Sequence, residues 1–283
     1  MALDIQPFEH VVDSKPGHFE FFHTIGWDFH LSPEWLSKFM LLEVVAAIII
    51  LLMYIPLARK VRTGAPPRGR WANACESLLT FIRDQVARPA IGEHDYVRYL
   101  PLLWTMFLFV LFCNLLGMIP FLASPTASIM VTGTLALIVF LTIHISGLKE
   151  NGLTGYLKSF IPHIEMNDPV MKIIGPPIVV GLFFLELMSA VIRGFVLAVR
   201  LFANMLAGHT VLFVLLLFIK LLGEAAHYDH STAANILFWP ITFASVIMVT
   251  LLSVLELFVG LLQAYVFTFL TAIFLGMALH PEH

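Results

Sequence analysis

The chain has little charge. Only 12% of its 283 residues are Asp, Glu, Lys or Arg, whereas about a quarter of the residues of a soluble domain are charged. It also lacks the basic surface of a nucleic-acid-binding protein and the polar composition of a disordered one. Hydrophobic residues make up 59%, and the mean hydropathy is +0.89. A water-soluble core cannot bury that much apolar surface, so we expect an integral membrane protein with several helical spans.

Cysteine is scarce too, with only Cys75 and Cys113. Two residues cannot form a disulfide framework, so we expect two inert thiols. The chain has no Walker-type glycine loop, which places any ATP chemistry on other chains. Residues 1–38 hold no short apolar core with a cleavage site, so we interpret them as an outer-side tail and not a signal peptide. Residues 39–283 are expected to form a single membrane domain.

Three apolar stretches have the length of ordinary membrane spans. They are Phe39–Leu57, Pro101–Ala123 and Ile129–Leu148. Each is close to the roughly 20 residues that a helix needs to cross the hydrocarbon layer. The corner Ser124–Thr126 contains a proline and joins the second and third spans as a tight hairpin.

Positive charge gathers in two of the connections. The first, Arg59–Leu100, includes Trp71–Val86, whose mixture of apolar and charged residues is typical of an amphipathic helix on the membrane surface. Lys149, Lys158 and Lys172 mark the second. The positive-inside rule places both connections in the cytoplasm and the N-terminal tail outside. The basic residues of the first connection are Arg59, Lys60, Arg62, Arg68, Arg70, Arg83, Arg88 and Arg98.

Two further apolar stretches are far too long for ordinary spans. Ile173–Leu222 and Asn235–Leu279 would measure about 75 Å and about 67 Å as single helices. Their middles contain isolated glycines and no turn residues. We therefore predict an all-α membrane fold that ends in two very long, strongly tilted, antiparallel helices. Their link, Gly223–Ala234, is expected outside and the C-terminus in the cytoplasm.

Ionisable residues interrupt the first of these long stretches. Such a group costs about 3 to more than 10 kcal/mol at mid-membrane, so it requires an explanation. Helical geometry places Glu186, Arg193, Arg200 and Asn204 within about 40° of one another, and His209 on roughly the opposite face. A purely structural hydrogen-bonded network, with Glu186 and Arg193 as a buried ion pair, is one reading of the stripe.

Arg200 fits the structural reading least well. No acid lies on the neighbouring turns of its segment, and a guanidinium keeps its charge at physiological pH. It therefore requires an acidic partner on another helix or another chain. The last long stretch adds Glu256 and Gln263 on one face, with Ser253 one turn before Glu256.

Several motifs resemble subunit a of the F-type ATP synthase family. They are VRLFANMLAGH (Val199–His209), LLQAYVF (Leu261–Phe267), NLLGMIP (Asn114–Pro120) and PTASIMVT (Pro125–Thr132). The likeness extends from about Leu102 to the C-terminus. It implies a proton-translocating stator subunit, not an enzyme by itself, in which two offset half-channels serve the carboxylates of a rotating ring of c subunits.

The resemblance also implies a role for each polar residue. Arg200 matches the essential arginine that faces the ring, and Asn204 and Gln263 match its neighbours at that interface. His209 and Glu256 match the outer proton path, with acid and histidine in the exchanged order that some family members have. The remaining candidates are Glu186 and Arg193 towards the cytoplasm, Ser253 and Asn114 along the path, and Glu224, His227, Asp229 and His230 at the outer entry.

The same resemblance sets the expected surroundings. They are a bacterial inner membrane, peripheral-stalk b subunits, the lipid bilayer and one copy per complex, with no cofactor, metal or nucleic acid. A secondary transporter that uses Arg200 to bind an anionic substrate is the alternative, although it predicts internal repeats and broken helices. A metalloenzyme using His227, Asp229 and His230, or His18 and His23, would need a third ligand at a specific spacing. His144 is expected to be structural.

Overall fold

The computed structural model describes residues 38–62, 69–119, 124–159, 169–229 and 232–280. All regular elements within these ranges are helical. Five helices are long and apolar enough to cross a membrane, so the expected all-α, multi-span architecture is confirmed. The tail expected over residues 1–38 lies outside the described residues, except for Lys38.

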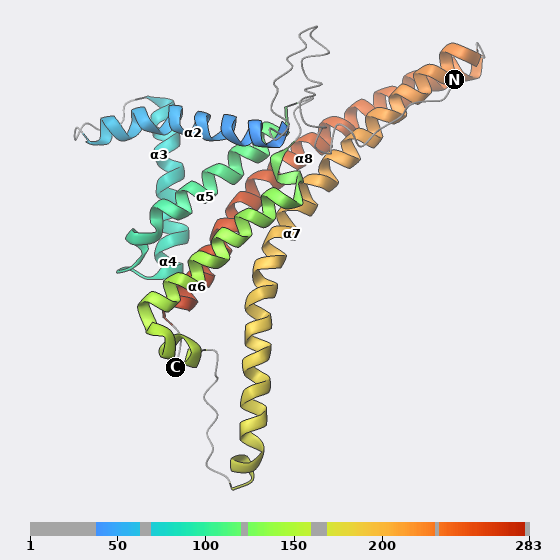
Figure 1. The fold of residues 1–283 in the computed structure, drawn as a ribbon. Helices are drawn as coiled ribbons and strands as arrows, with labels where there is room; N and C mark the ends of the chain where they lie inside the picture. The colour runs from blue at the N-terminus through green and yellow to red at the C-terminus, as the bar shows by residue number, and fades with distance from the viewer. Residues whose placement is uncertain (1–37, 63–68, 120–123, 160–168, 230–231, 281–283) are drawn as a thin grey trace. The chain divides into compact units, whose positions relative to one another are not determined.

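The described residues form two compact units, and several of the helices drawn in Figure 1 contribute residues to both. Unit 1 comprises the described parts of Met1–Ile55, Leu108–Val131 and Leu201–Ala264. Unit 2 comprises those of Pro56–Phe107, Thr132–Arg200 and Tyr265–His283. Both units hold candidate site residues.

The first three spans begin or end several residues from their expected limits. α2 (Lys38–Arg62) and α6 (Ile129–Ser159) both continue beyond the apolar stretch into polar sequence. α5 (Tyr96–Gly117) begins before Pro101, although that proline removes one helical hydrogen bond. α6 contains a break at Gly152, whose φ of 69° is easily reached only without a Cβ. The apolar stretches therefore predicted where the spans lie, but the helices continue into the polar residues that flank them.

The stretch Trp71–Val86 is helical but not one regular helix. α3 (Arg70–Phe81) passes into a π-helix, η1 (Ile82–Ala87), and then into α4 (Arg88–Ile91). The wider π turn directly precedes Pro89, which has no N–H for a regular helical bond. In α3, Cys75 is buried and burial raises the pKa of its thiol, in agreement with an inert role.

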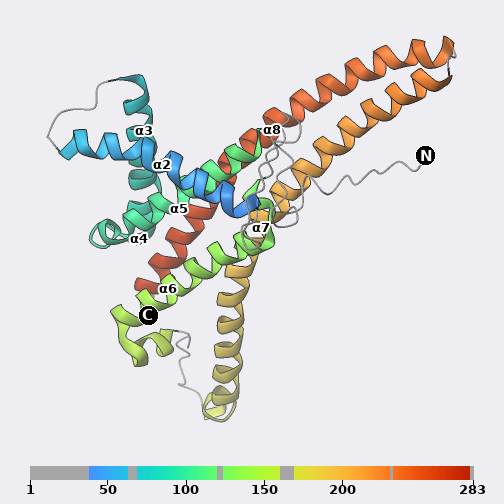
Figure 2. The same ribbon diagram turned by 45° about the horizontal axis from the view of Figure 1, so that its top comes forward.

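Both long apolar stretches are single helices, longer than their apolar parts. α7 (Pro169–Asp229) has 61 residues and α8 (Thr232–Leu279) has 48. The link expected over Gly223–Ala234 is helical through Asp229 and again from Thr232, because its Ala-rich ends continue the helices. Within unit 1, the orange parts of α7 and α8 run side by side in both views (Figures 1 and 2).

Each unit has its own internal packing. In unit 1, Ala46 of α2 packs with Cys113 and Leu116 of α5 in a buried cluster. The short 3-10 helix η2 (Pro125–Ala127) lies where the sequence predicted a corner between two spans, and its three residues are buried. In unit 2, the end of α8 lies beside α6 (Figures 1 and 2), where Asn151 donates a 3.0 Å hydrogen bond to the carbonyl oxygen of Ala278.

Candidate functional site

Polar contacts join α7 and α8 at two levels of unit 1. Asn204 Nδ2 donates to Gln263 Oε1 at 2.8 Å, and His209 Nδ1 lies 3.4 Å from Glu256 Oε1. As the residue number rises along α7 it falls along α8, which is the order of antiparallel helices. The structure thus brings together four of the residues that the sequence singled out, in two pairs.

The His209–Glu256 pair is buried and incompletely hydrogen-bonded. The exposed fractions of the two side chains are 16% and 5%. Within the described part of the chain, neither Glu256 carboxylate oxygen has a hydrogen-bond partner, and neither has His209 Nε2. Buried polar atoms without partners are costly and are usually satisfied by water. The pair therefore marks a place that water must reach or where a proton must reside.

A glycine makes room for this pair. A Cβ atom at Gly208 would lie 2.6 Å from Glu256 Oε1 and 2.9 Å from Glu256 Cδ. Real Cβ atoms essentially never approach other atoms so closely. The absence of a side chain at Gly208 is thus what allows the Glu256 carboxylate to lie against α7 beside His209.

A buried hydrogen-bond network holds α8 at a point between Glu256 and Gln263. Asn114 Nδ2 donates to the carbonyl oxygen of Gly260 at 3.0 Å, and Thr126 Oγ1 donates to Asn114 Oδ1 at 2.7 Å. Ser124 Oγ lies 2.7 Å from Thr126 Oγ1. Asn114 was expected along the proton path, but both ends of its amide already have protein partners. Ser253 donates to Val249 of its own helix at 2.9 Å.

In unit 2, Glu186 and Arg193 form the ion pair that the structural reading anticipated. Arg193 Nη2 lies 3.0 Å from Glu186 Oε1, and its guanidinium lies 5.6 Å from the centre of the Phe274 ring. The pair is not fully buried, since 34% of the Arg193 side chain and 46% of the Glu186 side chain are exposed. Both groups remain open to water or to another chain.

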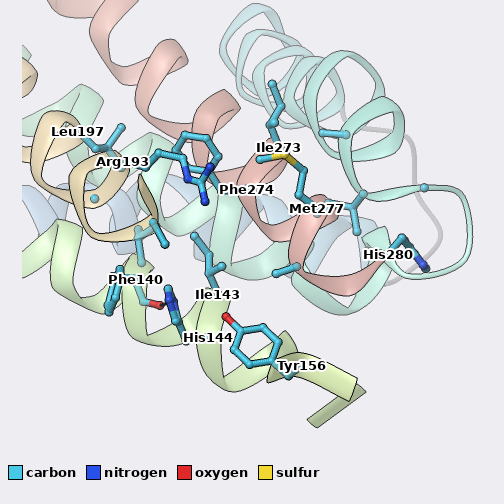
Figure 3. A pocket seen from close by; sticks show the side chains of 18 of the residues that line it. Phe140, Ile143, His144, Tyr156, Arg193, Leu197, Ile273, Phe274, Met277 and His280 are labelled. Carbon is cyan, nitrogen blue, oxygen red and sulfur yellow. Dashed lines mark hydrogen bonds between the residues drawn. The ribbon is translucent and has the colours of Figure 1, made fainter. Parts of the chain in front are cut away.

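The pair lines an open cavity of about 750 Å³ within unit 2. Its walls come from α6, α7, the end of α8 and the segment around α4. Figure 3 shows Arg193 beside Phe274 on one side and His144 and Tyr156, both of α6, on another. A hollow with several polar side chains is able to hold water. Phe274 and Tyr156 were not among the expected site residues, because an aromatic residue in an apolar helix carries no distinguishing sequence signal.

Arg200 is, with Lys220, one of two exposed charged residues on α7 among those whose side chains are described. Among the described residues no carboxylate lies within ion-pair distance of Arg200. The small residues Ala203 and Ala207, which follow on the same face of the helix, are also exposed. The expectation that Arg200 requires a partner beyond its own segment therefore stands.

The outer-entry candidates are only partly visible. The structure describes the backbone of Glu224, His227 and Asp229 as the last turns of α7 but not their side chains, and His230 lies outside the described residues. No group of three or more His, Cys, Asp or Glu residues suited to a metal ion occurs among the described residues.

Comparison with known proteins gives a consistent result. Residues 40–276 match the family described as ATP synthase A chain. The chain is similar to ATP synthase subunit a of Myxococcus xanthus, with 38% identity over 88% of this chain and 74% of that protein. It is also similar to ATP synthase subunit a of Chloroherpeton thalassium, with 35% identity over 99% of this chain and 78% of that protein.

Proposed function

Because the chain belongs to the ATP synthase A chain family, we propose that its polar residues form two offset half-channels that meet at Arg200. The chain is the proton-translocating stator subunit of the F-type ATP synthase, a membrane subunit and not an enzyme by itself. This membership does not favour the secondary transporter that the sequence left open.

The observation that carries the mechanism is the isolated charge of Arg200. An exposed guanidinium on a membrane helix requires a counter-charge from outside the chain. We assign that counter-charge to the carboxylates of the c-subunit ring, which would approach closely over Ala203 and Ala207. In the most apolar 18-residue stretch of α7 and of α8, only 11% of the residues are buried within the chain, whereas the share is 61% in that of α5. The two long helices therefore leave ample surface for the ring, the b subunits and lipid.

We assign the outer half-channel to His209 and Glu256. An imidazole and a buried carboxyl group are the side chains best suited to exchange protons near neutral pH, and their unpaired atoms call for water. Asn204 and Gln263 line the same helix pair towards Arg200, while Ser253 and Asn114 contribute to its walls. The entry residues that we propose are Glu224, His227, Asp229 and His230.

We assign the inner half-channel to Glu186 and Arg193 with the cavity beside them. Both residues lie within about 40° of Arg200 around α7, and both are partly exposed. A proton released near Arg200 would reach the cytoplasm along this side of the helix.

Arg200 separates the two half-channels electrostatically. A ring carboxylate that arrives protonated is stabilised in its ionised form by the guanidinium, so its proton leaves to the inner side. Because Arg200 does not release its own proton, it also blocks direct leakage. A proton crossing 100 mV gains about 2.3 kcal/mol, which drives rotation.

The orientation and helix arrangement are part of the same proposal. We place residues 39–283 as one membrane domain in the bacterial inner membrane, with residues 1–38 outside and the C-terminus in the cytoplasm. The long helices α7 and α8 are strongly tilted, since at about 1.5 Å per residue each is more than twice as long as the roughly 30 Å hydrocarbon layer is thick. The helix from Trp71 to Val86 lies on the cytoplasmic membrane surface.

The test is to replace Arg200 in the assembled complex. Arg200→Ala should abolish both ATP-driven proton pumping and gradient-driven ATP synthesis, because a ring carboxylate would then remain protonated at the interface. Arg200→Lys should not restore coupling fully, since an ammonium loses its proton more readily and lacks the planar fork of guanidinium.

A matched control uses an arginine on the surface of unit 2. Arg98 lies 3.7 Å from Glu150 in an exposed ion pair, which contributes little to stability, so Arg98→Ala should pump normally. The measurements are fluorescence quenching in inverted vesicles and ATP synthesis in energised vesicles, with the amount of assembled complex determined in each preparation. Near wild-type synthesis by assembled Arg200→Ala would refute the mechanism.

A further inference from the structure

The cavity of unit 2 contains a titratable residue that the half-channel scheme does not use. His144 lies on α6 and lines this cavity together with Glu186 and Arg193 of α7. In Figure 3, its ring lies across the cavity from Arg193. From the sequence we expected only a structural role for His144, because a lone histidine in an apolar span is most often a hydrogen-bonded core residue.

One ring nitrogen of His144 already forms a hydrogen bond. Nδ1 lies 2.8 Å from the backbone carbonyl oxygen of Phe140, one turn earlier on α6. A carbonyl oxygen only accepts hydrogen bonds, so Nδ1 must carry the hydrogen. The neutral ring then has its lone pair on Nε2, and this atom has no hydrogen-bond partner within the described residues.

This tautomer leaves Nε2 ready to accept a proton. The resulting imidazolium would keep the bond from Nδ1 to Phe140 unchanged, because both ring nitrogens are then donors. Imidazole is also the side chain that ordinarily changes charge between pH 5 and 8. Protonation and release at Nε2, which is a buried atom, therefore need cavity water to reach it but leave the bond from Nδ1 to Phe140 in place.

The other ionisable groups around the cavity are already engaged. Glu186 and Arg193 pair with each other, and His280, which follows α8, lies 3.1 Å from Asp95 through Nε2. The ring of Tyr156 stands edge-on to His144, with 6.1 Å between ring centres. The cavity-lining residues around α4, Pro89–Gly92, include no titratable side chain.

We propose that His144 is a proton-exchange residue of the inner half-channel. A proton released from a ring carboxylate near Arg200 passes to water in the cavity, and Nε2 takes it from that water. The imidazolium then returns it to another water molecule on the cytoplasmic side, so the ring ends neutral and one proton has moved. This role rests on the proposed function and deepens it.

The experiment compares two His144 variants in inverted vesicles, whose outer medium bathes the inner face of the subunit. His144→Gln retains an amide that can donate to Phe140, but it does not titrate in this range. His144→Ala leaves a space into which free imidazole fits. The readout is ATP-driven pumping as a function of the pH of the outer medium, normalised to the amount of assembled complex.

We expect both variants to pump about tenfold more slowly than wild type. This is less than the 10²- to 10⁴-fold typical of a lost proton-transfer group, because cavity water offers a parallel route. The dependence of their pumping rate on the outer pH should differ from that of wild type. Adding imidazole should restore part of the rate of His144→Ala but not of His144→Gln. His94→Gln is the matched control, because His94 is exposed and does not line the cavity, and it should pump as wild type does.

The outcomes separate this inference from the mechanism that it deepens. If Arg200→Ala stops coupled pumping while His144→Gln keeps the wild-type rate and pH profile, the role of His144 is overturned and the half-channels remain. A slower His144→Gln with an unchanged pH profile, and no rescue of His144→Ala by imidazole, would make His144 a structural residue. If assembled Arg200→Ala pumps normally, both proposals fail.

Discussion

Replacing Gly208 by alanine tests the geometry of the proposed outer proton path without removing any polar group. The new Cβ would lie 2.6 Å from Glu256 Oε1, so the carboxylate must retreat by about 0.8 Å to reach ordinary van der Waals contact. The contact between Glu256 and His209, now 3.4 Å, would open. The atom displaced is the end of a flexible side chain, so the change should disturb proton transfer more than folding.

The two energetic effects on folding nearly offset each other. Alanine is favoured over glycine in a helix by about 1 kcal/mol, and overpacking costs about 1 to 3 kcal/mol. We therefore expect normal assembly of Gly208→Ala. A misplacement approaching 1 Å at a reacting group can lower a rate by up to about 10²-fold, so we expect proton conduction to fall by about tenfold or more.

The assay is ATP-driven quenching of a pH-sensitive dye in vesicles, together with passive proton conduction under an imposed potential. Gly133→Ala on α6 is the matched control, because a Cβ there would meet nothing within 4 Å. Combining Gly208→Ala with Glu256→Asp should recover part of the activity, since the shorter carboxylate leaves room for the methyl group. Wild-type conduction by assembled Gly208→Ala would refute the reasoning that the close approach of Glu256 to α7 matters.

Two further predictions concern stability and orientation. Thr126→Val removes the donor to Asn114 Oδ1 from a fully buried network and should lower the free energy of unfolding by about 1 to 3 kcal/mol, measured as a lower thermal midpoint of the purified complex. In the control Thr142→Val, the lost hydroxyl bonds only within its own helix, so the free energy should change by less than about 0.5 kcal/mol. Equal midpoints for the two variants would contradict the stabilising role of the network. Thr154→Cys, at an exposed position of α6, should react with a membrane-impermeant thiol reagent in inverted vesicles but not in right-side-out ones. The two native thiols are buried and should contribute little labelling. Labelling in right-side-out vesicles only would reverse the proposed topology.

Hydropathy and charge were sufficient for the general plan of the fold. Apolar length predicted the five spans and the unbroken character of α7 and α8, because the cost of exposing backbone in lipid leaves few alternatives to helix. Helix ends were less predictable. Residues such as Tyr96–Leu100 and Gly223–Asp229 are neither strongly apolar nor rich in turn formers, so their helicity depends on continuity with the neighbouring helix.

The candidate site could be predicted as a list of residues but not as a set of pairs. The cost of a polar group in the membrane identified Asn204, His209, Glu256 and Gln263. Which of them meet depends on the register of α7 against α8, in which Gly208 packs against Glu256, while Asn114 ties α8 to α5 at Gly260. Local sequence contains no measure of such long-range contacts, so the hydrogen bonds at both ends of the Asn114 amide were not foreseeable.

The bond from Asn114 to Gly260 has a mechanical consequence. It clamps α8 at a point four residues after Glu256 and three before Gln263, which is about 6 Å from one and about 4.5 Å from the other along the helix. A stator experiences a reaction torque equal to the one that its rotor receives. With α8 anchored between Glu256 and Gln263, twisting either residue meets resistance from the buried segment at Ser124 and Thr126. This bond therefore stiffens α8 at the level where we propose that protons are transferred.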